Sequence, residues 1–371
     1  MRTTLKIAAA GLAAVLLAGT APSFADTIKI GVLVPTTGSE ATYGQDMANA
    51  VKIAIDEINK AGGVNGSQLA MVVGDDGCDP QQSVNAATKL ASSGIVGVVG
   101  GYCSGATLPT LKVFGDAKLP FVITAANSTQ LIPANPGNAF MINSTGNDQV
   151  AKATDYFKSK GIKSLAIVNE GDAYSQDLAN LEQKTWTAGG GTVPDFETVN
   201  KGEQDFSSVV TKINAANPDA VFWTAYYADG GPFIKQLREG GYQGLIAVGD
   251  GSNSPDLFKL AGKDAAEGVI GFSNPTAQFL PNAKAFSDTY TKEFGNPPGP
   301  YAPLTYDGTK LLAWAMNEAK STDSAKVIAA LKTANFTDTL SGPITFKPDN
   351  TLGRSNFIVL QGHNGDWELA K

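Results

Sequence analysis

The sequence is poor in the residues that bind metals and activate nucleophiles, with one histidine and two cysteines among its 371 residues. Two thiols and one imidazole are too few for an ordinary structural zinc site, so we expect neither a metal nor a cofactor. A serine hydrolase is disfavoured because the one histidine, His363, lies far along the chain from the candidate nucleophile Ser104. No Gly-Lys-Ser or Gly-Lys-Thr follows the glycines, so a phosphate loop is not predicted. These absences favour a binding protein over an enzyme, with an amidase-like hydrolase as the weaker alternative.

Basic residues are also in the minority, with 28 lysines and arginines against 35 aspartates and glutamates and a net charge of −7. An acidic chain without a basic run is a poor partner for nucleic acid or for an anionic membrane surface. We therefore expect a small molecule as the ligand, and no nucleic acid or membrane as a direct partner.

The first 25 residues have the pattern of a secretory signal peptide. Arg2 and Lys6 precede an apolar run at residues 7–18, and residues 23–25 offer a small-x-small cleavage site. The run is shorter than the roughly 20 residues of a membrane span. We expect an exported, soluble, periplasmic protein that begins at Asp26.

Beyond residue 26, short apolar runs alternate with amphipathic segments of helical period. Such alternation predicts an α/β protein with parallel sheets and helices on both faces. The pattern occurs twice, and the length suits two lobes rather than one core. The predicted strands are residues 28–34, 69–73, 95–99 and 120–124, then 164–168, 192–199, 220–224 and 245–248; the predicted helices are 43–60, 84–90 and 107–117, then 174–187, 206–216 and 232–239.

The C-terminal part has a different character, because three predicted helices follow one another without strands between them. Such helices must pack on an existing sheet, and we assign most of this segment to the first lobe. The predicted helices are residues 282–294, 304–319 and 324–334, and the predicted strands are 268–272, 344–346 and 356–360 with 367–369. The predicted lobes are residues 26–145 plus 274–350 and residues 146–273 plus 351–371, two Rossmann-like units joined as a hinged clamp.

Candidate ligand-binding residues follow the predicted strands, because ligands of such sheets bind outside the carboxyl ends of the strands. Ser104 opens a helix, where its hydroxyl and free N–H groups suit a carboxylate; alternatively, it caps the helix. Ser128 would supply a second hydroxyl, and the Ala126 carbonyl would accept from an ammonium. Asp250, between two glycines, would pair an ammonium or be a solvated turn residue.

Tyrosines also begin several of these loops rather than following a helical core spacing. Tyr43, Tyr102, Tyr174 and Tyr226 have this position. Tyrosine suits a pocket wall because it is apolar along its ring and polar at its tip. The alternative for each is an ordinary rim residue.

The two cysteines, Cys78 and Cys103, both lie near strand ends. In an exported protein they favour a disulfide over two free thiols.

Several segments resemble the periplasmic leucine/isoleucine/valine-binding proteins, the extracytoplasmic receptors of branched-chain amino acid ABC transporters. Residues 75–80, Asp-Asp-Gly-Cys-Asp-Pro, and residues 101–104, Gly-Tyr-Cys-Ser, look like the disulfide-linked loops of that family. Residues 31–44 resemble its first rim loop, and residues 202–206 its short acidic turn. The resemblance covers the mature chain and implies the type I periplasmic binding fold, which closes two lobes on its ligand.

The resemblance also implies roles for single residues. Ser104 and Ser128 would bind the α-carboxylate of an amino acid, while the Ala126 carbonyl and Asp250 would hold its ammonium. The family often has glutamate in place of Asp250 and threonine in place of Ser128. Tyr174 and Tyr226 would close from the second lobe, and Tyr43, together with Tyr306, would line the side-chain pocket.

Two residues depart from the family pattern. Tyr102 stands where a branched-chain binder tends to have an aliphatic residue, and Asn127 stands where it has a small apolar one. Both make the side-chain pocket smaller or more polar, which predicts a small or polar amino acid or a related amine-carboxylate. The implied partner is a membrane permease, and we expect a monomer; a sensory subunit without transport is the alternative.

Overall fold

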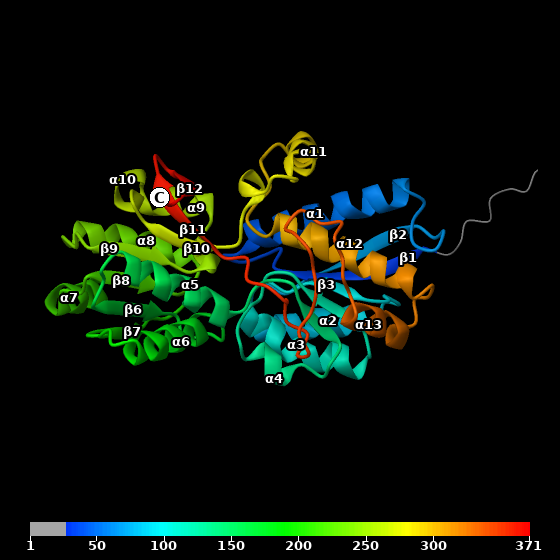
Figure 1. Ribbon diagram of the computed structural model, residues 1–371, viewed down its shortest axis with the longest axis horizontal. Coiled ribbons are helices and arrows are strands. Elements are labelled where there is room, and N and C mark those ends of the chain that lie inside the picture. Colours follow the sequence, from blue (N-terminus) through cyan, green and yellow to red (C-terminus); the bar gives the residue numbers. More distant parts are fainter. Residues whose placement is uncertain (1–26) are drawn as a thin grey trace, which may run out of the picture.

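The computed structural model describes residues 27–371 and consists of two α/β lobes side by side (Figure 1). The predicted signal peptide and Asp26 lie outside the described residues. Within the described part, no helix combines the length and the apolar character needed to cross a membrane. The fold class is as predicted: each lobe is built on its own sheet, and the two sheets are separate.

The first lobe contains a five-stranded, wholly parallel sheet in the order β2-β1-β3-β4-β5. Its strands are β1 (Ile28–Val34), β2 (Leu69–Asp75), β3 (Val98–Gly100), β4 (Phe121–Ile123) and β5 (Ala139–Met141). Its helices are α1 (Ala41–Lys60), α2 (Pro80–Ala91), α3 (Ser104–Asp116), α4 (Leu131–Ala134), α11 (Lys284–Phe294), α12 (Ala302–Glu318) and α13 (Ser324–Lys332).

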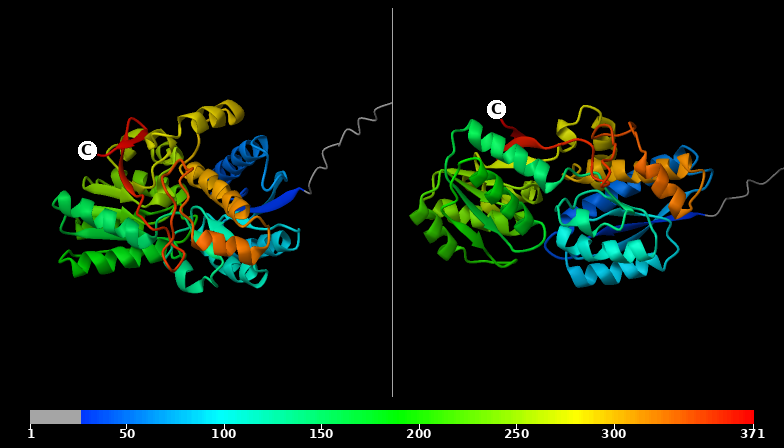
Figure 2. Two further views of the ribbon diagram at one scale, coloured as in Figure 1. Left: turned by 45° about the vertical axis from the view of Figure 1, so that its right-hand side comes forward. Right: turned by 60° about the horizontal axis from the view of Figure 1, so that its bottom comes forward.

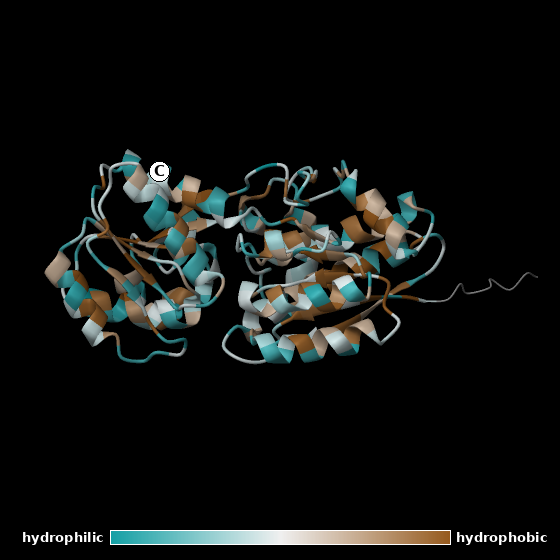
Figure 3. Cartoon of the chain, turned by 90° about the horizontal axis from the view of Figure 1, so that it is seen from below, coloured by the Kyte–Doolittle hydropathy of each residue, from teal (hydrophilic) through white to brown (hydrophobic). Residues whose placement is uncertain are grey.

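The alternation of side chains along β1 explains the layers of this lobe. Val32 and Val34 pack in the same cluster as Met47 of α1, whereas Leu33 packs in another cluster with Phe114 of α3. Successive strand residues point to opposite faces, so a helix layer lies on each side of the sheet. α12 packs along α1 and α3 along α2, and Figure 3 shows the apolar residues concentrated on the strands and inner helix faces.

The second lobe contains a seven-stranded sheet in the order β12-β11-β10-β9-β8-β6-β7. Its strands are β6 (Leu165–Asn169), β7 (Phe196–Thr198), β8 (Ala220–Trp223), β9 (Leu245–Val248), β10 (Ile270–Ser273), β11 (Ile358–His363) and β12 (Asp366–Leu369). Its helices are α5 (Gly146–Ser159), α6 (Ser175–Ala188), α7 (Ser207–Ala216), α8 (Tyr227–Glu239), α9 (Pro255–Ala261) and α10 (Lys263–Ala266).

Three local expectations differ from the structure. The second sheet is not wholly parallel, because β11 and β12 pair antiparallel at one edge. Residues 344–346 form isolated bridges and no strand. Helix α8 begins at Tyr227 and contains Pro232, whereas the predicted helix begins at Pro232. A proline favours the first turn of a helix without marking its first residue.

The predicted disulfide is confirmed. It joins Cys78 and Cys103, whose Cα atoms are 5.4 Å apart, and so links the loop after β2 to the residue before α3. Next to it, Asp79 caps α2 by accepting from the backbone N–H of Gln82, and Pro80 is the first residue of the helix.

The chain passes between the two lobes after β5, after β10 and before β11, and both views in Figure 2 show the lobes joined there. Buried polar side chains tie these connections together. Asn274 donates to Asn143, and the N–H of Asn356 donates to the Ser144 hydroxyl at 2.8 Å. Three short connections of this kind permit a rotation of the lobes about a common hinge.

Candidate functional site

A small cavity lies between the lobes at the carboxyl ends of their parallel strands; we call it the tyrosine cavity. Four of its residues come from each lobe. Its free volume is about 10 Å³, roughly the space of one water molecule. The first lobe contributes Tyr102, Ala125, Asn127 and Tyr301, and the second contributes Tyr174, Tyr226, Asp250 and Gly251.

Asp250 supplies a buried carboxylate to this cavity. It follows β9 and is 2% exposed. Its Oδ1 accepts from the Tyr174 hydroxyl at 2.8 Å, and its Oδ2 accepts from the side-chain amides of Asn127 at 3.1 Å and Asn143 at 3.4 Å. Burial raises the pKa of Asp250 above its ordinary value, and these donors oppose the rise. The site thus holds a carboxylate that a cationic group would stabilise further.

The tyrosines form a continuous aromatic wall. The ring centroid of Tyr102 is 5.8 Å from that of Tyr226 and 5.3 Å from that of Tyr301. Tyr43 of α1 lies behind the wall, with its ring centroid 4.9 Å from that of Tyr102. Within residues 27–371, the buried hydroxyls of Tyr43 and Tyr226 have no hydrogen-bond partner. The wall is therefore apolar along its rings and has unused polar groups at its edges.

Ser104 positions the loop that carries Asn127. It is the first residue of α3, and the helix cap is Cys103, so the N-cap interpretation of Ser104 is wrong. The Ser104 hydroxyl accepts from the backbone N–H groups of Asn127 at 3.3 Å and Ser128 at 3.2 Å. As an acceptor of two bonds it still has its own hydrogen to donate.

Direct hydrogen bonds join the two lobes around the cavity. Asp177 of α6 accepts from the Ser128 hydroxyl at 3.0 Å and from the Thr129 backbone N–H at 2.6 Å. The Tyr227 hydroxyl donates to the Ser39 carbonyl at 2.9 Å. With the bond from Asn127 to Asp250, these contacts describe a closed arrangement of the lobes.

A second carboxylate, Glu40, lies beside the cavity at the start of α1. It is fully buried, and its Oε2 accepts from the Tyr102 hydroxyl at 3.0 Å. Its Oε1 has no hydrogen-bond partner in the described part of the chain. Burial raises the pKa of Glu40 to about 7, although the bond from Tyr102 works in the opposite direction.

The structure brings together five of the nine candidate residues. These five line the cavity: Tyr102, Asn127, Tyr174, Tyr226 and Asp250.

The other candidates do not line the cavity. Tyr43 backs the wall, Ser104 and Ser128 hold the loop, and Ala126 packs in an apolar cluster of the first lobe. Tyr306, which we expected to line the side-chain pocket, donates to Glu57 and is not among the residues that line the cavity. Tyr301 lines the cavity instead. Tyr301 shares the signal of the other tyrosines, a position at the start of a helix.

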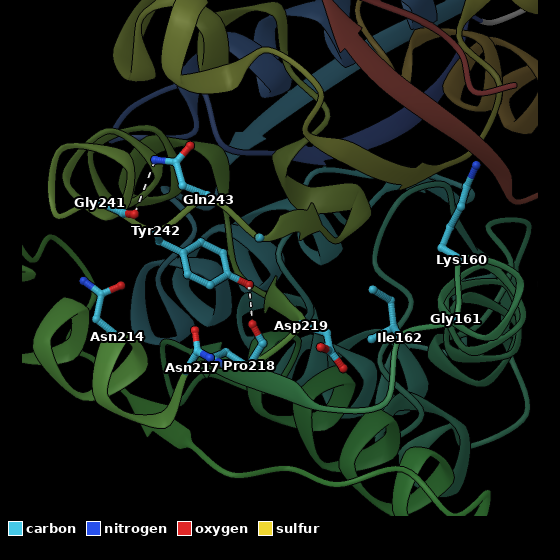
Figure 4. Close-up of a pocket in the computed structure, with 11 residues that line it drawn as sticks. Lys160, Gly161, Ile162, Asn214, Asn217, Pro218, Asp219, Gly241, Tyr242 and Gln243 are labelled. Carbon is cyan, nitrogen blue, oxygen red and sulfur yellow. Dashed lines mark hydrogen bonds between the residues drawn. The ribbon is translucent and has the colours of Figure 1, made fainter.

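A larger hollow, with a free volume of about 570 Å³, lies elsewhere in the second lobe (Figure 4). It is formed by the loops that precede β6, β8 and β9, which is the opposite edge of the sheet from Asp250. Its polar groups bond within the hollow: the Tyr242 hydroxyl donates to the Pro218 carbonyl, and Asp219 accepts from two backbone N–H groups. Ligands of parallel sheets bind at the carboxyl ends, so the tyrosine cavity is the better candidate. Among residues 27–371, no group of three or more acidic, histidine or cysteine side chains is placed to hold a metal.

Comparison with known proteins shows the same architecture. Residues 27–366 match the family described as periplasmic binding protein. The leucine-, isoleucine-, valine-, threonine- and alanine-binding protein of Pseudomonas aeruginosa is 29% identical over 340 residues, which are 91% of each chain.

Two solved structures extend this comparison. The branched-chain amino acid transporter substrate-binding protein LivJ of Streptococcus pneumoniae, in complex with isoleucine, is 27% identical with a TM-score of 0.85, covering 93% of this chain and 99% of that chain. A solute-binding protein of an ABC transporter from Rhodopseudomonas palustris, in complex with 3,4-dihydroxybenzoic acid, is 26% identical with a TM-score of 0.81, covering 92% and 95%. The resemblance inferred from the sequence is confirmed. These relatives are binding proteins and not enzymes, and so is this chain.

Proposed function

The chain belongs to the periplasmic binding protein family, and from that premise we propose that it captures a small amino acid or related amine-carboxylate and delivers it to the permease of an ABC transporter. The observation that carries this proposal is the buried Asp250 carboxylate, which faces the cavity between the lobes. A carboxylate without a cationic partner is costly to bury, and an ammonium group of the ligand supplies that partner.

In this proposal, each rim of the cavity has its own role. Asp250 and the Ala126 carbonyl accept from the ammonium, while Ser104 donates its remaining hydrogen to the carboxylate, with Ser128 beside it. Tyr174 and Tyr226 cover the ligand from the second lobe. The tyrosine wall and Asn127 support a small or polar side chain rather than a branched aliphatic one, because an aliphatic group leaves buried polar atoms unpaired.

Closure of the lobes links binding to delivery. A ligand that contacts both Asp250 and the loop of Ser104 has more contacts in the closed form than in the open one. The ligand therefore shifts the population toward the closed form, and a permease would recognise the protein in that form. We propose the hinge at the three lobe connections, with the lobes divided near residues 145, 273 and 350, in a periplasmic monomer.

The tyrosine-rich lining favours a second candidate, a hydroxylated aromatic acid like the one bound to the Rhodopseudomonas palustris relative. Tyrosine rings stack on aromatic ligands, and phenolic hydroxyls would donate to Asp250. The buried charge of Asp250 favours the amine-carboxylate, since the aromatic acid has no cationic group to pair with a buried carboxylate.

A thermal-shift screen tests both candidates. The purified protein is heated with each amino acid, with small amine-carboxylates such as 2-aminobutyrate, and with 3,4-dihydroxybenzoate. A ligand present at about a thousand times its Kd adds roughly 4 kcal/mol to the free energy of unfolding and raises the midpoint clearly. A shift by amino acids supports the proposal, a shift by the aromatic acid alone transfers it to the second candidate, and no shift by any amine-carboxylate contradicts it. Uptake of the stabilising ligand by cells with and without the gene distinguishes transport from sensing.

A further inference from the structure

The polar groups beside Tyr102 are incompletely paired, whereas both carboxylate oxygens of Asp250 accept hydrogen bonds. The Glu40 Oε1 atom and the hydroxyls of Tyr43 and Tyr226 are all buried and have no hydrogen-bond partner within residues 27–371. The rings of Tyr43 and Tyr226 both lie close to the ring of Tyr102, with centroid distances of 4.9 and 5.8 Å. A buried polar group without a partner calls for an explanation, and at a binding site a group of the ligand can supply the missing partner.

Glu40 is held in place for such a partner. It lies in the first rim loop, directly before α1, and the Tyr102 hydroxyl fixes one of its oxygens at 3.0 Å. Tyr102 itself lines the cavity, so the carboxylate is one hydrogen bond away from the ligand space. No ion pair joins Glu40 to a lysine or arginine in the described chain; the ammonium of Lys201 instead lies 5.8 Å above the Tyr226 ring.

We propose that Glu40 is a specificity-determining residue, which uses its free carboxylate oxygen to select amino acids whose side chain carries a hydrogen-bond donor. The inference rests on the proposed function and deepens it. An aliphatic side chain of the same size leaves Oε1 unpaired, whereas a hydroxyl or amide donates to it. A site with a buried acceptor discriminates strongly against a ligand that lacks the donor. The Tyr102 hydroxyl acts as a positioning group, because it holds the Oε2 atom of Glu40 and leaves Oε1 free.

Threonine and valine form a suitable pair of probes, because they have nearly the same shape and differ by a hydroxyl in place of a methyl group. Serine and 2-aminobutyrate form a second, smaller pair. We expect calorimetry on the wild-type protein to give at least about tenfold tighter binding for the donor-bearing member of the pair. The ratio of the two Kd values, rather than either value alone, is the quantity that Glu40 controls.

The decisive variant is Glu40→Gln, which keeps an oxygen for the Tyr102 hydroxyl and replaces the free acceptor by an NH₂ donor. We expect the Kd ratio to fall toward one, because a hydroxyl that accepts from a neutral amide is bound less strongly than one that donates to a carboxylate. The matched control is Glu182→Gln, because Glu182 is equally buried and also has an unpaired oxygen, but it bonds to Thr154 between α5 and α6. This control should keep the wild-type ratio.

If Glu40→Gln does not fold, Tyr102→Phe replaces it, since it removes only the hydroxyl that orients Glu40. It should also lower the ratio. A wild-type preference for valine over threonine, or a ratio that both variants leave unchanged, would overturn the role of Glu40 while the amine-carboxylate function stands. Absence of binding by every amino acid would instead overturn the proposed function itself, and the role of Glu40 with it.

Discussion

The two buried carboxylates beside the tyrosine cavity differ in how they are paired. Asp250 receives hydrogen bonds on both oxygens, from Tyr174 on one and from Asn127 and Asn143 on the other. Glu40 receives one bond, from Tyr102, and has a free oxygen. The difference suggests two kinds of recognition in one cavity: a preorganised anchor at Asp250 and an acceptor at Glu40 that waits for the side chain of the ligand.

We expect the largest effect, on the free energy of unfolding, from removal of the disulfide next to Tyr102, the residue that bonds to Glu40. The double variant Cys78→Ser, Cys103→Ser removes a cross-link between two residues that are 25 positions apart in the sequence. The chain-entropy model gives a loss of about 3 kcal/mol in the free energy of unfolding, measured by denaturant titration. Affinity for the ligand should change much less, because Asp250 is untouched. An unchanged stability would show that the disulfide does not stiffen this rim.

Substitution of the anchor should cause the next largest effect. Asp250→Asn removes the charge that pairs the ammonium, and we expect at least a hundredfold weaker binding, about 2.7 kcal/mol. Calorimetry with the ligand found by the thermal screen measures it. Asp264→Asn, on an exposed position of α10, is the control and should bind as the wild type does. Equal affinities for the two variants would remove Asp250 from the site.

A contact between the lobes, outside the cavity, should matter less. Asp177→Ala removes the acceptor for Ser128 and Thr129, which belong to the opposite lobe. We expect about tenfold weaker binding, near 1.4 kcal/mol, because the closed form loses these bonds. Small-angle scattering with saturating ligand should still show closure. The exposed neighbour Gln176→Ala is the control; a similar loss there would assign the effect to α6 rather than to closure.

The smallest effect is a pH dependence that only Glu40 should cause. Its pKa is raised to about 7 by burial, with Lys201 and the Ser39 and Tyr102 side chains lowering it and Asp229 raising it. A donor-bearing ligand prefers the ionised form, so its affinity should fall about threefold from pH 7.5 to pH 6.5 as Glu40 takes up a proton. An aliphatic ligand should show no such fall, nor should the Glu40→Gln variant with either ligand. A fall that persists in that variant would assign the titration to another group.

Sequence reasoning located the two lobes and the anchor because their signals are local. Strand-helix alternation predicts every strand of both sheets except β5, and a polar residue after a strand end, such as Asp250, is placed at the rim by the topology alone. The N-cap alternative for Ser104 is wrong, because its hydroxyl accepts from the backbone N–H of Asn127 instead, while its contact with a carboxylate stays a prediction.

The contacts between the lobes could not be predicted in this way. Tyr301 reaches the cavity from the start of α12, and Glu40 meets Tyr102 across a separation of 62 residues. Asn143, in the lobe connection after β5, donates to Asp250 of the second lobe. Such pairs depend on the crossing of the chain between lobes, and no periodicity within a segment encodes that crossing. The unpaired oxygen of Glu40 can be identified only in the folded structure, once the hydrogen-bond partners of the neighbouring groups are known.

In the proposed function, Asp250 binds the ammonium group of an amine-carboxylate. Titration of the wild-type protein with the stabilising amino acid, and with the same acid lacking its α-amino group, measures this contact. We predict that the amino acid binds and that the deaminated acid binds at least a hundredfold more weakly, a difference that disappears in Asp250→Asn. Equal binding of the two acids by the wild-type protein would contradict the claim.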